Sequence, residues 1–172
     1  MGLDSHMVAA EPGAALTRAD IERLLRGGEI PARLDLRGKN VQGANLAGLP
    51  LAGADLSGAN LSGVNLEGAD LNNARMAGTT LSGANLSETH LSGGLLQGAI
   101  LNHADLRRAI LDHADLTKAD LRGADLRWAD LSGANLSWAD LRMARLSRCK
   151  LRKANLRGIL LPAQDTLAFF VF

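Results

Sequence analysis

The sequence predicts an all-β fold in which a five-residue repeat winds into a four-sided solenoid. Every fifth residue from Leu36 to Leu161 is apolar, and 24 of these 26 positions are Leu, the others being Val41 and Met76. Ala stands two residues before 17 of them, and Gly stands two residues after 14. An unbroken repeat of this kind is the primary evidence for a solenoid.

A period of five matches neither the 3.6 residues of an α-helix nor the two residues of a flat strand. In an extended segment Ala54 and Leu56 share the inward face while Asp55 points outward. The next inward Leu, five residues on, keeps its direction only if the chain turns a corner within each pentad. Gly58 and its equivalents suit such a tight corner.

Four corners of about 90° close a square of about twenty residues, and neighbouring coils lie about 4.8 Å apart. The 26 units then form about 6.5 coils, a column roughly 31 Å tall. We expect Leu side chains to fill its axis with Ala beside them. The core must be aliphatic, because aromatic residues make up only 3% of the chain.

Both open ends of such a column expose unpaired backbone, so we expect a cap at each. Residues 1–7 resemble an expression leader, and residues 8–33 form an N-terminal segment. Thr17 and Asp20 there predict a capping box that starts a short amphipathic helix, which Gly27–Gly28 ends. The solenoid spans residues 34–161.

Residues 162–172 predict a C-terminal cap or a dimerisation segment. The apolar side chains concerned are Leu167, Phe169, Phe170 and Phe172. They can fold back over the last Leu layer, or two copies can dock end to end and bury the same rings. We expect the second arrangement, a homodimer through the C-terminal end.

Composition bounds the remaining possibilities. A net charge of +1 does not favour nucleic acid as a partner, and the basic run from Arg142 to Arg157 turns around the corners to face several sides. The chain has one cysteine, Cys149, which replaces an inward Ala; it fits a reducing compartment and a small core residue. Without an apolar run of about twenty residues we expect no membrane span, and a cytoplasmic protein.

Units such as Ala54–Gly58 and Ala124–Trp128 closely resemble the A-(D/N)-L-x-x pattern of the pentapeptide-repeat family. The resemblance covers about three quarters of the chain and implies a right-handed quadrilateral β-helix. Within that family, one branch resembles the quinolone-resistance proteins, which are dimeric, are thought to imitate DNA, and bind DNA gyrase and topoisomerase IV. Other members are scaffolds or regulators, because this fold does not fix a function.

A DNA mimic needs closely spaced negative charge along one face. The candidates are Asp105, Asp120, Asp125 and Asp140. Each is followed two residues later by an arginine, which we expect to neutralise it. The simpler interpretation is therefore charge pairing between coils on a solvated surface.

Three aliphatic residues, Leu95, Ile100 and Ile110, occupy outward positions where Asp or Asn is usual. They indicate a contact surface, unless neighbouring long side chains shield them.

Trp128 and Trp138 lie ten residues apart, hence on opposite sides, and we expect each to cover a corner.

His90, His103 and His113 are the remaining metal or acid–base candidates, but no ligand set accompanies them, so we interpret them as surface residues. No cleft, nucleophile–base pair or phosphate loop is indicated, so we predict no catalytic residue, cofactor or metal. The sequence therefore predicts a non-catalytic scaffold with an unidentified protein partner; the alternative is a gyrase-binding DNA mimic.

Overall fold

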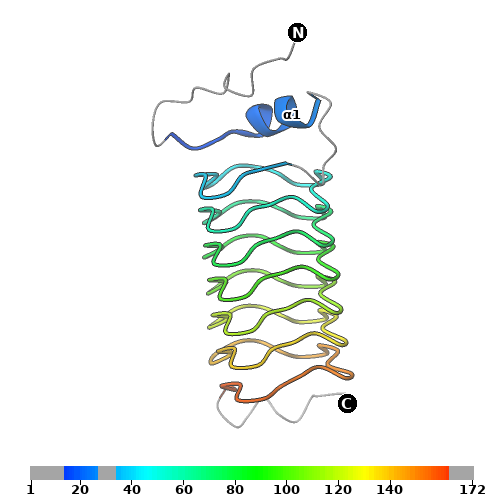
Figure 1. The fold of residues 1–172 in the computed structure, drawn as a ribbon. Helices are drawn as coiled ribbons and strands as arrows, with labels where there is room; N and C mark the ends of the chain where they lie inside the picture. The colour runs from blue at the N-terminus through cyan, green and yellow to red at the C-terminus, as the bar shows by residue number, and fades with distance from the viewer. Residues whose placement is uncertain (1–13, 27–33, 163–172) are drawn as a thin grey trace.

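The structure, a computed structural model, describes residues 14–26 and 34–162. The predicted leader, the Gly27–Gly28 helix end and the C-terminal residues Leu167, Phe169, Phe170 and Phe172 lie outside this part. The described chain forms one helix, α1 (Arg18–Arg26), followed by a column of stacked coils, with α1 at one end of the column (Figure 1).

The coils pair in parallel with a register of twenty residues. Every outward residue from Asp35 to Asp140, at intervals of five, forms a single parallel β-bridge with the residue twenty positions later. Each bridge is one residue long because the chain turns a corner before a second pair can form. This is the register that four pentads per coil require.

Each pentad makes a fixed set of backbone hydrogen bonds. In one unit Asp55 N–H donates to Leu34 O (2.9 Å) in the previous coil, and Leu56 N–H donates to Arg75 O (2.7 Å) in the next. Most backbone donors and acceptors of the inner coils are thus used between coils, as a buried backbone requires.

The corner is a β-turn closed by the central residue. Leu56 O accepts from Ala59 N–H at 2.9 Å. Two residues after the central residue, φ is positive at every described corner from Gly38 to Gly158, at 14 glycines and at 11 other residues. This backbone matches a type II turn, whose third residue has positive φ and favours glycine.

The interior is filled by aliphatic side chains, as predicted. The central residues from Leu36 to Leu146 are at most 2% exposed and form one core cluster with the inward Ala residues. Thr79 and Thr89 replace two of these Ala residues, and their hydroxyls donate to Leu56 O (2.8 Å) and Leu86 O (2.6 Å). Cys149 is also buried at an inward position.

The predicted helix is present, and its start has the capping-box hydrogen bonds. Thr17 N–H donates to Asp20 Oδ2 (2.9 Å), and Asp20 N–H donates to Thr17 Oγ1 (3.3 Å). Leu16 and Ile21 join the core, and Leu16 N–H donates to Asn40 O at 2.7 Å. The helix therefore packs against the first coil.

Four flat faces result, and we number them by their first outward residue. Face 1 begins at Asp35, face 2 at Asn40, face 3 at Asn45 and face 4 at Pro50, and each recurs every twenty residues. One pentad on a face is called a row. Residues two apart in a row, such as Asp105 and Arg107, point outward on the same face.

The corner glycines differ in what lies beside them, and this gives a matched test. A Cβ at Gly63 would meet nothing within 4 Å, whereas a Cβ at Gly123 would lie 2.6 Å from Nδ1 of His103. Both have positive φ (62° and 67°). Gly63→Ala should cost about 1 kcal/mol of unfolding free energy, and Gly123→Ala about 0.5–1.5 kcal/mol more, because the imidazole must leave its rotamer.

Urea unfolding followed by circular dichroism measures both changes. In a His103→Ala background the extra cost at Gly123 should disappear, because the imidazole is then absent. Equal costs at the two glycines in the unaltered chain would contradict this account of the corner.

Candidate functional site on the solenoid faces

The four aspartates predicted as DNA-mimic candidates are each held by an arginine of the same row. Arg107 donates through Nε and Nη2 to the two carboxylate oxygens of Asp105, at 2.8 and 2.6 Å. Arg127 donates to both carboxylate oxygens of Asp125 through the same two nitrogens. Such a two-pronged contact fixes orientation as well as charge.

The same arrangement recurs on face 2, where Arg122 binds Asp120 at 2.6 Å and Arg142 binds Asp140 at 2.7 Å. Contacts between coils are longer, at 3.9 Å from Arg122 to Asp140. We expected neutralisation chiefly between coils; the closest contacts lie within one row, because both side chains leave the same extended segment on the same side.

These bonds lower the pKa of the aspartates. Hydrogen bonds from Arg122 and Arg142 are the main cause at Asp120 and Asp140. At Asp105 partial burial alone would raise the pKa, but bonds from Arg107 outweigh it. On face 1, hydrogen bonds from Arg37 lower the pKa of Asp35 to about 2.

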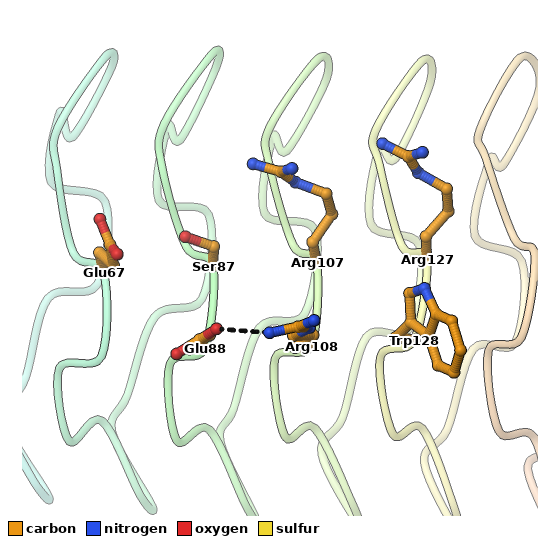
Figure 2. A pocket seen from close by; sticks show the side chains of 7 residues that line it. All are labelled: Glu67, Ser87, Glu88, Arg107, Arg108, Arg127 and Trp128. Carbon is orange, nitrogen blue, oxygen red and sulfur yellow. Dashed lines mark hydrogen bonds and ion pairs between the residues drawn. The ribbon is translucent and has the colours of Figure 1, made fainter.

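A groove runs along face 3 beside its corner, with a volume of about 360 Å³. Figure 2 shows its lining side chains arranged along successive coils, from Glu67 at one end to Trp128 at the other. The lining residues are Glu67, Ser87, Glu88, Arg107, Arg108, Arg127 and Trp128. The carboxylates and the arginines thus occupy different ends.

Within the groove, Arg108 Nη1 lies 3.2 Å from Glu88 Oε1, one coil away. Trp128 is 52% exposed, and the guanidinium of Arg148 lies 4.3 Å from its ring centre. Sequence reasoning missed Glu67, Glu88 and Arg108 as a group. The available signal was their spacing of about twenty residues, which a comparison of single pentads does not use.

The three outward aliphatic residues do not form one surface. Leu95, Ile100 and Ile110 are 39%, 40% and 38% exposed, but they lie on faces 1, 2 and 4. They therefore share no single face, and a contact surface at any of the three stays a prediction.

Of the remaining candidates, His103 and His113 stand at corners, Cys149 is in the core, and His90 is an outward residue of face 4. The rings of His103 and His113 lie over Gly123 and Gly133 of the next coil, and no group of three metal-ligating side chains occurs among the described residues. Burial raises the pKa of the Cys149 thiol to about 12, so this thiol is a poor nucleophile.

The arrangement of the coils defines a class, the four-sided β-solenoids. The family model for pentapeptide repeats matches in eight copies, over residues 33–63, 54–93, 91–127 and 129–159. The chain therefore belongs to the pentapeptide-repeat family. No curated protein matches it.

Solved structures of the same kind resemble the chain at moderate identity. HetL, a protein involved in heterocyst differentiation regulation from the cyanobacterium Nostoc sp. strain PCC 7120, is 33% identical, with 74% of each chain covered and a TM-score of 0.43. Rfr23 from the cyanobacterium Cyanothece 51142 is 31% identical (60% of this chain covered, TM-score 0.42), and the match spans 63% of Rfr23.

A trypsin-treated variant of QnrB1, a plasmid-mediated fluoroquinolone resistance protein, is 19% identical over 74% of this chain and 77% of its own, with a TM-score of 0.31.

The described residues contain no helix that is long and apolar enough to span a membrane.

The aspartate–arginine bonds predict an acid-sensitive fold. An aspartate whose pKa is lowered on folding adds stability that is complete above the unfolded value of about 3.9 and disappears as the pH falls through the folded value. Stability should therefore decrease from about pH 4 downward. Replacing Asp105, Asp120, Asp125 and Asp140 with Asn should make the free energy of unfolding depend less on pH in this range. Near pH 7 the same change should lower the free energy of unfolding by roughly 0.2–1 kcal/mol per pair.

Urea midpoints measured at a series of pH values give both slopes. An unchanged slope in the fourfold variant would show that other groups govern acid unfolding.

Proposed function

We propose that this chain is a non-catalytic scaffold that presents flat polar faces to a protein partner. The observation that carries the proposal is the filled interior: the central Leu and inward Ala residues occupy it with almost no exposure. Catalysis needs a concave site that excludes water around converging polar groups. The surface groove of face 3 is open. Its arginines are paired with carboxylates: Arg108 with Glu88 inside the groove, and Arg107 and Arg127 with the aspartates beside it.

The faces support a role in binding because they are rigid and regularly spaced. Rows repeat at the spacing of paired strands, about 4.8 Å. Side chains such as Asn45, Asn65 and Asn85 bond from row to row, at 3.2 and 3.1 Å. A partner would meet preorganised side chains and lose little affinity to their ordering.

We do not propose the alternative role of a DNA mimic for gyrase. The four carboxylates that would carry it are bonded to Arg107, Arg122, Arg127 and Arg142 at 2.6–2.7 Å. A paired carboxylate does not reproduce the field of a phosphate row.

Site-specific photo-cross-linking tests the scaffold role. Ala77, Ser82, Ser87 and Ser92 stand at the same position of four consecutive pentads, one on each face. A photoreactive residue placed at each in turn should cross-link one and the same partner from one or two faces only. The purified partner should then bind the unaltered chain saturably. Equal labelling from all four faces, or turnover of a substrate by the purified chain, would contradict the proposal.

We also propose a homodimer through the C-terminal end. Leu156, Ile159 and Leu161 of the last described coil are only partly buried, and such an end layer needs a cover. At high salt, deleting residues 167–172 should convert a dimer into a monomer in light scattering, because the contact is apolar and is not weakened by salt. A full-length chain that is monomeric at high concentration would overturn this proposal.

A further inference from the structure

Face 3 separates its carboxylates and its arginines along the column. Its three N-terminal rows, 45–48, 65–68 and 85–88, carry two carboxylates and no cation. Its three C-terminal rows carry two aspartates and five arginines. These charged residues are Glu67, Glu88, Asp105, Asp125, Arg107, Arg108, Arg127, Arg145 and Arg148.

A second copy in antiparallel orientation places opposite charges together. A half-turn about an axis that lies in the face and crosses the column keeps each position in the row and reverses the order of the rows. Glu67 then faces Arg127 of the second copy, and Glu88 faces Arg108. Each contact occurs twice because the two-fold axis repeats it.

The neutral rows are also complementary under this operation. Asn65 faces Asp125 of the second copy, so an amide donor meets a carboxylate. Trp128, which is 52% exposed, faces the corner of Gly68, where no atom lies within 4 Å of a Cβ position. The exposed ring thus meets an open corner. No two like charges within the six rows are opposed, although Arg18 of α1, whose Nη1 donates to Ala47 O at 3.0 Å, lies beside the row that faces Arg145 and Arg148.

The other faces fail the same operation about their own midpoints. On face 4 Asp70 would oppose Asp130, and on face 1 Arg37 would oppose Arg157. On face 2 Arg122 and Arg142 would oppose Ser82 and Ser62, so no opposite charges meet. Self-complementarity is a property of face 3 alone among the four described faces.

We infer that face 3, through Glu67, Glu88, Arg108, Arg127 and Trp128, binds a second copy of this chain side by side and antiparallel. The arginines can take part because Arg107 and Arg127 bind their aspartates through Nε and Nη2, which leaves Nη1 for the second copy. A strip of six rows, about 29 Å long, is at the small end of specific interfaces, so the association is weak and depends on salt.

Charge exchange tests the pairing directly. Arg127→Glu places a carboxylate opposite Glu67, and Glu67→Arg places a cation opposite Arg127, so each single change should weaken association about tenfold or more. The double variant Glu67→Arg/Arg127→Glu restores opposite charges across the two-fold axis and should return the dissociation constant to within about threefold of the original. Within one chain the two positions are three coils apart, so rescue reports the contact between copies.

Sedimentation equilibrium at about 0.05 M and about 0.5 M NaCl measures these constants. The matched control is Arg122→Glu, which breaks an identical aspartate contact on face 2 and should leave association unchanged. Urea unfolding of each variant shows whether it is folded. If Arg127→Glu does not fold, Glu67→Arg alone carries the test, because Glu67 makes only an exposed contact.

Repeating the experiment without residues 167–172 separates this contact from the C-terminal dimer. Loss of association at face 3 with the end contact intact, or the reverse, identifies which proposal fails. In a Trp138→Phe background Trp128 is the remaining tryptophan, and its emission should shift to the red on dilution. The inference would be overturned if the single changes left the dissociation constant unaltered, or if the double variant did not restore it.

Discussion

The inward leucine at every fifth residue is the constraint on which the rest of the structure depends. Burying Leu56 and then Leu61 on the same side requires the chain to turn between them, and the turn requires positive φ at Gly58. Four such turns bring Asp55 next to Arg75, twenty residues on, and the backbone hydrogen bonds between coils follow. The outward Asp and Asn side chains also support the corner, as where Asp55 Oδ1 accepts from Ser57 N–H at 3.0 Å. The other outward side chains are available for function.

The same separation explains how much of the fold could be predicted from the sequence. The five-residue period requires the corner and the twenty-residue register, and Thr17 with Asp20 predicts the start of α1. The positive φ of Arg108, Trp128 and nine other non-glycine corner residues was not predictable, because such residues rarely adopt positive φ by preference. At these corners the hydrogen bonds to the coils on both sides hold the backbone in the turn conformation. The right-handed sense of the coil remains a prediction from the family resemblance.

The surface was harder to predict, for a geometric reason. A residue's face depends on its position within twenty residues, whereas its inward or outward direction depends on its position within five. Leu95, Ile100 and Ile110 share the second property but not the first, so they lie on different faces. Glu67, Glu88, Arg108 and Trp128 share a face although they are far apart in sequence, and they form the groove. The aspartate–arginine contacts were predictable, because the partners are only two residues apart.

Deleting one whole coil tests the central claim most directly. Removing residues 101–120 joins Ile100 to Leu121 and preserves both the inward frame and the faces, whereas removing residues 103–120 joins Asn102 to Leu121 and breaks the frame by two residues. Urea unfolding followed by circular dichroism should show a cooperative, slightly less stable fold for the first deletion and a much larger loss of stability for the second. Similar stability of the two deletions would show that the five-residue inward frame does not hold the column together.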